Sequence, residues 1–227
     1  MTRVALVTGG SRGLGKALTR SLLERGWTVV IDGRDREGLK HAVVELSDPA
    51  LRAIEGDVSD GNHRRRLAEE IEDLGQLDLV VNNASFLGPS PQPRLDRYPP
   101  EVFREVFEVN VVAPLVILQE FLPLLRRSHG VVINVTSDAA VEGYEGWGGY
   151  GSSKAALEQL TRVLATEEPG ISVYWIAPGD MNTRMQQEAF PGEDVSDRSP
   201  PEASVPGLLH LIEVRPPSGR YLARQIA

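Results

Sequence analysis

The sequence predicts a doubly wound α/β fold, in which a seven-stranded, mostly parallel sheet carries helices on both faces. Three observations favour this class. Short apolar runs recur seven times, helical patterns lie between most of them, and a glycine-rich turn joins the first run to the first helix. Strands that are apolar on both faces and alternate with helices are typical of a parallel sheet with ligands at the carboxyl ends of its strands.

The individual elements follow from the pattern. The expected strands, in chain order, are residues 3–8, 27–31, 51–55, 77–81, 130–136, 171–177 and 219–224. The first helix is expected over 14–26, because its leucines share one face and Gly26 stands where a left-handed C-cap belongs. Further helices are expected to begin near Glu37, Asp60, Pro99 and Tyr150. Without repeats or low-complexity linkers, residues 1–227 are expected to form a single domain.

The composition excludes several function classes. A formal charge of −8 argues against a nucleic-acid partner, because such partners normally need a basic surface. The basic cluster from His63 to Arg66 opens a helical pattern, and we interpret it as a solvated helix face. The chain has no cysteine and its four histidines show no ligand spacing, so we expect neither thiol chemistry nor a metal site.

The sequence gives no sign of membrane insertion or export. The longest uninterrupted apolar run, residues 111–118, is far shorter than the roughly 18 residues that indicate a span. The N-terminus enters a strand-like run directly, without the charged region and apolar segment of a signal peptide. We therefore expect a cytoplasmic protein with no membrane partner.

The turn from Thr8 to Gly15, "TGGSRGLG", ends the first strand and begins the first helix. Its glycines at 9, 13 and 15 let the backbone turn tightly and come close to a pyrophosphate. The helix N-terminus then presents unpaired N–H groups to the anion. The turn therefore predicts a dinucleotide site, the alternative being a plain tight turn.

Tyr150 and Lys154 lie four residues apart at the start of a helical pattern, so both project from one face. A free tyrosine, with a pKa of about 10, is a poor acid or base at neutral pH. An ammonium one turn away lowers that pKa toward useful proton transfer. Taken alone, the pair also fits an ordinary surface Tyr with a solvated Lys.

Two further polar residues strengthen the catalytic interpretation. Ser137 follows the strand over 130–136, where its hydroxyl can hydrogen-bond a substrate carbonyl, although it also fits a loop cap. Asn110 lies inside a long helical pattern, 101–125. Pro114 cannot donate an N–H to the carbonyl of Asn110, which leaves that carbonyl free in mid-helix. A kinked core helix with a satisfied Asn is the alternative.

Together these motifs resemble the classical short-chain dehydrogenase/reductase family. The turn has the spacing T-G-x-x-x-G-x-G, "NNA" follows at 82–84, and "YGSSK" stands at 150–154, in that order along nearly the whole chain. The resemblance implies a Rossmann fold and hydride transfer between a nicotinamide and a carbonyl or secondary alcohol, the small-molecule substrate.

The resemblance also implies roles for the four residues. Tyr150 is the general acid in reduction and the base in oxidation, and Lys154 tunes it and binds the nicotinamide ribose. Ser137 orients the carbonyl, and the main chain of Asn110 holds a water that links Lys154 to solvent.

Cofactor contacts carry over from the family pattern as well. They are Thr8, Gly9, Ser11, Arg12, Gly13, Leu14, Gly15, Arg34, Asp57, Val58, Asn82, Asn83, Ala84, Pro178, Gly179 and Thr183, besides Tyr150 and Lys154. The family usually has glycine after the N-N-A motif, whereas this chain has Ser85, so its loop is free to turn differently.

The stretch "VVIDGRDREG" contains conflicting signals for the cofactor. By spacing alone, Asp32 suggests a carboxylate on the ribose 2′-hydroxyl and hence NAD. In the family register the discriminating acid is one residue later, at Gly33, which has no side chain. Arg34 follows and Arg12 lies in the glycine turn, and two guanidiniums suit a 2′-phosphate. We therefore expect NADP(H) to be preferred over NAD(H).

Two stretches that follow strand ends, 86–100 and 180–201, are candidate substrate-side loops, and the second is expected to be a mobile lid. Tyr144 and Trp147 precede the catalytic tyrosine, and they fit either an apolar substrate wall or the anchor of a mobile loop.

Two other functions stay open. One is a non-catalytic NADP-binding sensor or scaffold on the same fold, although no member of the catalytic set is missing. The other is a dehydratase or epimerase of the extended branch, which the glycine spacing and the short carboxyl end argue against. The resemblance further implies a homodimer or homotetramer, formed through the helices that contain Asn110 and Tyr150.

Overall fold

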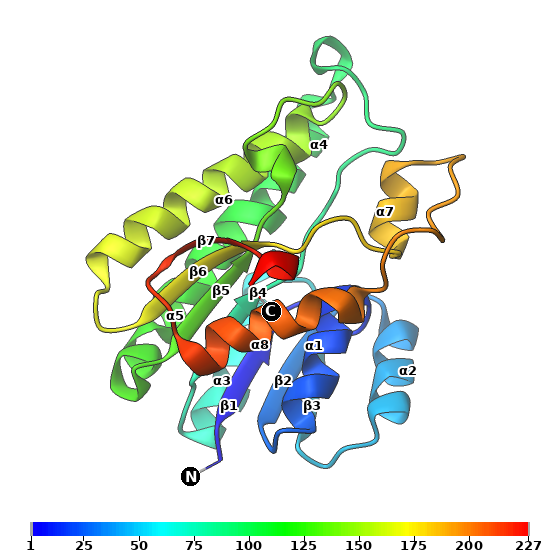
Figure 1. Cartoon of the computed structure of the whole chain (residues 1–227). Coiled ribbons are helices and arrows are strands. Elements are labelled where there is room, and N and C mark those ends of the chain that lie inside the picture. The colour runs from blue at the N-terminus through cyan, green and yellow to red at the C-terminus, as the bar shows by residue number, and fades with distance from the viewer. Residues whose placement is uncertain (1, 227) are drawn as a thin grey trace.

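Seven parallel strands form one sheet in the computed structural model, which describes residues 2–226 (Figure 1). The strands are β1 (Val4–Val7), β2 (Thr28–Gly33), β3 (Leu51–Glu55), β4 (Leu79–Asn82), β5 (Val131–Val135), β6 (Ser172–Ala177) and β7 (Gly219–Leu222). Their order across the sheet is β3-β2-β1-β4-β5-β6-β7, so the direction of winding reverses between β1 and β4. The predicted doubly wound class is confirmed, and the sheet is wholly rather than mostly parallel.

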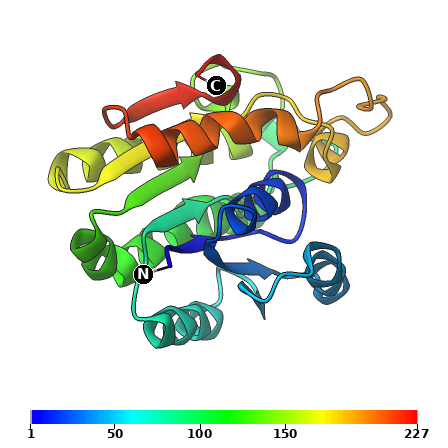
Figure 2. The same cartoon turned by 60° about the horizontal axis from the view of Figure 1, so that its bottom comes forward.

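Helices cover both faces of this sheet. One face carries α1 (Gly13–Leu23), α2 (Arg36–Leu46) and α8 (Val205–Val214), and the other carries α3 (Gly61–Leu74), α5 (Ala113–Ser128) and α6 (Gly148–Glu167). Figure 2 shows α8 and α3 on opposite sides of the strands. The sequence predicted a helix in each of these places except α8.

Alternate residues of each strand face the two helical layers. In β1, Ala5 and Val7 join the core beneath α1 and α8, whereas Val4 and Leu6 join the core beneath α3 and α5. Burial of a Leu or Val side chain stabilises the fold by about 1.5–3 kcal/mol. Because both faces of the central strands β1, β4 and β5 are buried, these strands are nearly continuous apolar runs, which is why they were visible in the sequence.

Local signals set the helix ends. After α1, Gly26 has the expected left-handed backbone, with φ of +74°, and its N–H donates to the carbonyl of Leu23. Asp35 and Asp60 precede α2 and α3, and their carboxylates accept hydrogen bonds from the backbone N–H groups of Gly38 and Asn62. Such caps satisfy donors that a helix leaves unpaired.

The predicted long helix over 101–125 is present but contains a wider turn. Helix α4 (Pro100–Phe107) passes through a π-helical turn (Glu108–Val112) into α5. In this turn the N–H of Ala113 donates to the carbonyl of Glu108, five residues earlier. Pro114, which has no N–H, follows directly, so the ordinary ladder is interrupted here. Asn110 lies at the centre of this wider turn.

Helical residues 100–128 contain an 18-residue window that is apolar enough to span a membrane, with a mean hydropathy of 1.5, and the helix is also long enough. In this fold, 44% of that window is buried. Ile117, Phe121 and Leu125 pack in the core with residues of β4, β5 and α3. The segment is therefore a core helix of the doubly wound fold.

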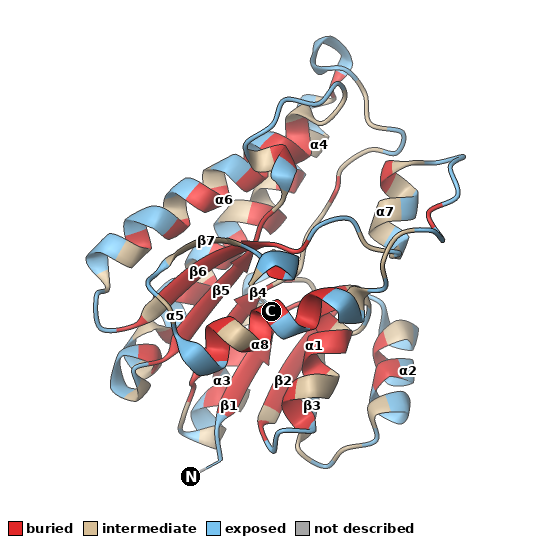
Figure 3. Ribbon diagram, in the orientation of Figure 1, coloured by how far each residue is buried: buried red, intermediate tan, exposed pale blue. Residues whose placement is uncertain are grey.

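Largely exposed segments extend beyond the carboxyl ends of some strands. Figure 3 shows buried strands and largely exposed segments around α7 (Arg184–Ala189), beyond β6. Residues 86–100 lie at this same end of the sheet (Figure 1).

Candidate active site

The glycine turn between β1 and α1 has the backbone that close contact with an anion requires. Gly9 and Gly13 have φ of +64° and +53°, a region that residues with a Cβ rarely adopt. A Cβ on Gly15 would lie 2.5 Å from both the carbonyl oxygen of Gly9 and Nδ2 of Asn83. The turn and the α1 N-terminus therefore form a compact cradle that only glycine allows.

The loop after β4 holds this turn in place. Asn83 Nδ2 donates to the carbonyls of Thr8, at 2.8 Å, and Gly9, at 3.2 Å. The hydroxyl of Thr8 accepts from the N–H groups of Asn83 and Ala84, both at 3.0 Å. Thr8 and Asn83, which are both predicted to contact the cofactor, thus use their side chains to hold the ends of β1 and β4 together.

Asn82 is engaged inside the core. Its Nδ2 donates to Oδ1 of Asn134 at 2.7 Å, and Asn134 donates in turn to the Thr161 hydroxyl at 2.6 Å. All three side chains are buried. Asn82 therefore links β4, β5 and α6, and its expected contact with the cofactor stays a prediction.

Asp32, at the end of β2, is buried and bound to the protein itself. Its Oδ1 accepts from the Gly9 N–H at 2.6 Å, and its Oδ2 lies 2.9 Å from Nε2 of His63. Both carboxylate oxygens are thus engaged by the protein, and Asp32 braces the glycine turn through Gly9. These contacts agree with the sequence-based expectation that Asp32 does not select NAD.

His63 corrects one sequence expectation. The cluster from His63 to Arg66 was interpreted as a solvated face, but the His63 side chain is fully buried against Asp32. Arg64 Nη1 donates to the carbonyl of Val58 at 2.6 Å. The predicted helix is present, but α3 packs beneath β2 and thereby directs His63 toward Asp32, which contacts the glycine turn.

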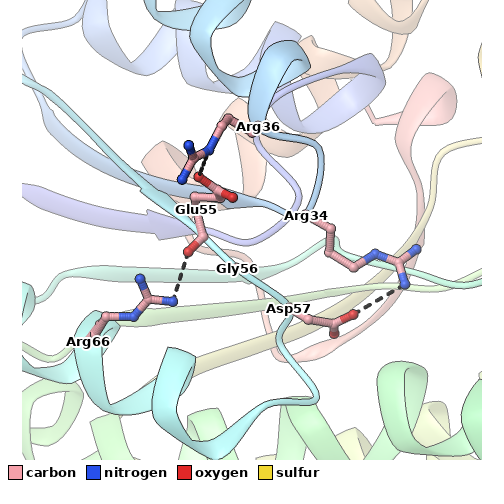
Figure 4. Close-up of a pocket in the computed structure, with 6 residues that line it drawn as sticks. All are labelled: Arg34, Arg36, Glu55, Gly56, Asp57 and Arg66. Carbon is pink, nitrogen blue, oxygen red and sulfur yellow. Dashed lines mark hydrogen bonds and ion pairs between the residues drawn. The ribbon is translucent and has the colours of Figure 1, made fainter.

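A basic pocket lies beside the β2 and β3 ends (Figure 4). Its volume is about 340 Å³, and it is lined by Arg34, Arg36, Glu55, Gly56, Asp57 and Arg66. The guanidinium of Arg34 lies 3.2 Å from the Asp57 carboxylate, and that of Arg36 lies 2.6 Å from Glu55. Arg66 donates to the carbonyl of Glu55 at 2.9 Å.

This pocket contains one predicted arginine and two that were missed. Arg34 is there, as expected, but Arg12 stands exposed before α1 and does not line the pocket. Arg36 and Arg66 supply the other guanidiniums of this pocket, and the expected contact of Arg12 with the cofactor stays a prediction. Arg36 is only two residues beyond Arg34, whereas the position of Arg66 depends on how α3 packs.

Asp57 and Gly33 shape the same region. Burial favours a higher pKa for Asp57, but hydrogen bonds from the Ser59 N–H and hydroxyl, together with Arg34, outweigh it and lower the pKa. A Cβ on Gly33 would lie 2.8 Å from the Ser11 hydroxyl oxygen, so an acidic side chain there needs Ser11 to move. Val58, beside Asp57, is buried in the core.

Tyr150 and Lys154 lie together in the first turns of α6. The Lys154 ammonium nitrogen is 5.5 Å from the centre of the Tyr150 ring, and it donates to the carbonyl of Val135 at 2.8 Å. The side chains are buried, with 8% and 2% of each residue exposed. The alternative of an ordinary surface pair is therefore wrong for this structure.

Burial controls the protonation of both residues. It raises the pKa of Tyr150 to about 12. The negative charge of Asp138 contributes to this rise, whereas a hydrogen bond with Ser85 partly opposes it. Burial lowers the pKa of Lys154 to about 8. The expectation that the ammonium lowers the Tyr150 pKa is therefore not met in the protein alone, because loss of hydration disfavours both charged forms.

Ser137 begins a short turn beyond the end of β5. Its hydroxyl donates to the Asp138 carboxylate at 2.8 Å and accepts from the Ala139 N–H at 3.2 Å. A Cβ on Gly151 would lie 2.6 Å from the carbonyl oxygen of Ala139, so glycine is what lets this turn approach α6 beside Tyr150. The structure thus places Ser137, Tyr150 and Lys154 around one strand end.

Asn110 is fully buried in the π-helical turn and its side chain is satisfied. Its Oδ1 accepts from the Phe86 N–H at 2.8 Å and from the Ser85 hydroxyl at 3.1 Å. Its Nδ2 donates to the carbonyl of Phe86 and to the hydroxyl of Ser153, both at 2.9 Å. Ser85, where the family pattern has glycine, is therefore part of this network, and a free Asn110 carbonyl stays a prediction.

The substrate-side segments meet above Tyr150. Trp147 packs edge-on against Tyr150 and at a tilt against Phe190, with ring centres 5.8 Å apart in each pair. Leu87 and Ala189 join the same apolar cluster. Tyr144 lies further out, 6.4 Å from Trp147 and nearly half exposed.

The segment that follows β6 turns from the strand end to α7. Gly179 has φ of +79°, and the Pro178 carbonyl accepts from the Ser204 hydroxyl at 2.8 Å. Thr183 caps α7 through its hydroxyl, and its methyl would lie 3.6 Å from a Cβ on Gly13. The predicted nicotinamide segment is thus close to the glycine turn.

A parallel sheet with a glycine cradle at one strand end and a buried Tyr-Lys pair at another defines the class of dinucleotide-dependent oxidoreductases. Residues 3–194 match the family model described as short chain dehydrogenase. The chain therefore belongs to the short-chain dehydrogenase family, and it is an oxidoreductase acting on CH–OH and C=O groups.

Several known proteins are similar over most of the chain. The rhamnolipids biosynthesis 3-oxoacyl acyl-carrier-protein reductase of Pseudomonas aeruginosa is 42% identical over 194 residues, which are 81% of this chain and 74% of that protein. A Shigella flexneri short-chain dehydrogenase complexed with NADP is 29% identical, with a TM-score of 0.90 and coverage of 98% and 97%. The Pseudomonas aeruginosa RhlG/NADP complex is 34% identical, with a TM-score of 0.84 and coverage of 97% and 94%.

Among the described residues, no group of three or more His, Cys, Asp or Glu is placed to hold a metal ion.

Proposed function

We propose that the protein is an NADP(H)-dependent carbonyl reductase or alcohol dehydrogenase that uses Tyr150 as its acid and base. The observation that carries this proposal is the buried Tyr150–Lys154 pair, which lies beside the Ser137 turn at the carboxyl edge of the sheet. The glycine cradle is at this same edge, so a hydride donor bound there reaches the same region.

The residues present fit a dinucleotide. The glycine turn supplies a cradle with no room for a Cβ at Gly15, and the α1 N-terminus supplies N–H donors for a pyrophosphate. The pocket with Arg34, Arg36 and Arg66 suits an additional phosphate, because guanidinium groups bind phosphate bidentately. Related proteins crystallised with NADP support the same cofactor.

Bound NADPH supplies a hydride to the carbonyl carbon. In that direction the Tyr150 phenol donates its proton to the carbonyl oxygen, and in oxidation the phenolate takes a proton from the alcohol. The Ser137 hydroxyl, which donates to Asp138 in the protein alone, turns to donate a hydrogen bond to the same oxygen and orients it. Lys154, held by the Val135 carbonyl, stays close enough to Tyr150 to favour the phenolate when protonated.

Asn110 supports this arrangement through the backbone. Its side chain hydrogen-bonds both the N–H and the carbonyl of Phe86. It also donates to the Ser153 hydroxyl on α6, and this hydroxyl donates in turn to the carbonyl of Tyr150. We propose that it fixes the position of Tyr150, in addition to the proton relay expected from its main chain.

The test is NADPH oxidation against a panel of ketones, aldehydes, quinones and 3-oxoacyl thioesters, with NADH in parallel. The name of the Pseudomonas aeruginosa relative makes the 3-oxoacyl thioesters a natural member of the panel. Turnover of any carbonyl with NADPH supports the proposal. Tight NADPH binding without turnover of the whole panel would favour the non-catalytic sensor instead.

Replacing Arg34 with alanine is expected to weaken NADPH binding about 10- to 100-fold, because a hydrogen bond to a charged group contributes about 1.5–3 kcal/mol. NADH binding should change little, since NADH lacks the 2′-phosphate. Fluorescence titration with each cofactor measures both. Arg52→Ala, an exposed arginine on β3 outside the pocket, is the control. An unchanged NADPH affinity in Arg34→Ala would contradict the assignment.

We also propose that residues 180–201 close over the site as a lid. Phe190 connects this segment to Trp147, and the Ser90 hydroxyl donates to the carbonyl of Glu188 at 2.6 Å. Trp147 and Phe190 then form an apolar wall beside Tyr150, with Tyr144 at its outer edge.

Phe190→Ala is expected to raise the KM of the carbonyl substrate about 2- to 10-fold, because an aromatic pair contributes about 0.5–1.5 kcal/mol. The kcat should change less, since no reacting group is removed. Steady-state kinetics on the best panel substrate separates the two constants. Phe190→Trp keeps an aromatic contact and should retain the parent KM; equal losses in both variants would argue against a role for the ring.

Assembly and location follow from the family resemblance. We propose one domain over the whole chain and a cytoplasmic homodimer or homotetramer that pairs through α5 and α6. Val112, Leu115 and Val163 are exposed apolar residues on or beside these helices. Light scattering of Val163→Glu against the parent chain tests this assembly, and unchanged oligomers would contradict it.

A further inference from the structure

A partly buried ion pair holds the strand end that carries Ser137. The Arg220 guanidinium on β7 lies 3.0 Å from Oε1 of Glu158 on α6, and the Glu158 side chain is only 5% exposed. The Thr136 hydroxyl donates to the same carboxylate oxygen at 2.8 Å. The second arm of the guanidinium, Nη2 of Arg220, donates to the carbonyl of Ser137 at 3.2 Å.

The sheet register explains how β7 reaches this point. Asn134 of β5 is paired with Trp175 of β6, which is paired with Arg220 of β7. Paired residues of parallel strands direct their side chains to the same face, here the face covered by α6. The Arg220 side chain therefore crosses β6 to meet both Glu158 and the main chain beyond β5.

Three successive residues beyond the middle of β5 are then held by polar side chains, two of them buried and one, Arg220, partly buried. Lys154 binds the carbonyl of Val135, Glu158 binds the hydroxyl of Thr136, and Arg220 binds the carbonyl of Ser137. Two of these groups come from α6, one helical turn apart. The turn that presents the Ser137 hydroxyl is thus tied to the helix that carries Tyr150.

We propose that Arg220 is a positioning residue that fixes the Ser137 hydroxyl relative to Tyr150, so that the last strand controls the geometry of catalysis. This inference rests on the proposed role of Ser137. Only an arginine has a planar fork with several donors, so only Arg220 holds the Glu158 carboxylate and the Ser137 carbonyl at once. Loss of the second contact frees the Ser137 turn without breaking the ion pair.

Arg220→Lys separates the two contacts. Lysine keeps a positive charge for Glu158 but presents a single ammonium, so the thermal unfolding midpoint should stay near that of the parent. The kcat on the panel substrate should fall about 10- to 100-fold, because small misplacements of a catalytic group have effects of this size. NADPH affinity should not change, since Arg220 lies outside the glycine turn and the arginine pocket.

The decisive measurement combines Arg220→Lys with Ser137→Ala. If Arg220 acts through the Ser137 hydroxyl, Arg220→Lys should lower kcat in the parent chain. In the Ser137→Ala chain the same change should lower kcat by less than about twofold, because the effects of coupled residues are not additive. Equal losses in both backgrounds, or no loss in the parent, would overturn the proposal. An unimpaired Ser137→Ala single variant would instead contradict the proposed role of Ser137.

Amide hydrogen exchange provides a readout that needs no substrate. Residues 136–140 should exchange faster in Arg220→Lys than in the parent chain, whereas exchange in the α1 region should stay the same. Arg126→Lys is the matched control, because Arg126 also pairs with a glutamate of the α6 end, Glu168, but at the exposed far end of the helix. Unchanged exchange over 136–140 would contradict the positioning role even if kcat fell.

Discussion

Replacing Tyr150 with phenylalanine is expected to lower kcat about 100- to 10,000-fold, the usual contribution of general acid–base catalysis. The variant removes one hydroxyl and keeps the ring that packs against Trp147, so the fold and the NADPH affinity should be preserved. Steady-state kinetics in both reaction directions, with a fluorescence titration of NADPH, measures the two effects.

The control for this variant is Tyr144→Phe. Its hydroxyl donates to the Asp138 carboxylate at 3.2 Å, but the residue is exposed and is the outer member of the aromatic group. This variant should keep most of the parent kcat. Parent-like turnover by Tyr150→Phe would contradict the proposed mechanism and leave cofactor binding intact.

Replacing Asp32 with alanine is expected to lower the free energy of unfolding by about 3–5 kcal/mol. The change leaves the partly buried N–H of Gly9 and the buried ring of His63 without their partner, and an unsatisfied buried group costs about 1–3 kcal/mol. NADPH affinity should fall as well, because Asp32 holds the first glycine of the cradle. Urea unfolding and a cofactor titration measure these two losses.

Asp35→Ala provides the comparison, because Asp35 is a nearby aspartate that is exposed and caps α2 through the Gly38 N–H. Loss of such a cap costs about 1 kcal/mol. If Asp32→Ala is no more destabilising than Asp35→Ala, Asp32 does not brace the turn as described.

The parts of the site that the sequence predicted are those that a local spacing encodes. The four-residue spacing from Tyr150 to Lys154 places both on one helical face wherever that helix lies. The glycine turn is likewise readable, since backbone shape depends directly on the residues at 9, 13 and 15. Alternation of apolar runs and helical patterns was enough to predict the sheet.

The missed parts depend on how distant elements meet. His63 was assigned to solvent because its neighbours are charged, yet the packing of α3 under β2 buries it against Asp32. Arg66 and Arg220 reach their partners from α3 and β7, at distances along the chain that no motif encodes. The sequence predicted a lowered pKa for Tyr150, whereas burial raises it. The spacing reveals the nearby ammonium but not the loss of hydration.

The hydrogen bond between Asn82 and Asn134 bears on how the sheet aligns itself during folding. These residues are paired across β4 and β5, whose other members are nearly interchangeable valines, leucine and isoleucine. A slip by two residues would keep every side chain on its proper face, so hydrophobicity alone does not forbid it. Such a slip would separate the two amides and leave at least one of them opposite hydrocarbon, so the two asparagines favour the alignment in which the cradle and the catalytic helix lie at the same edge of the sheet.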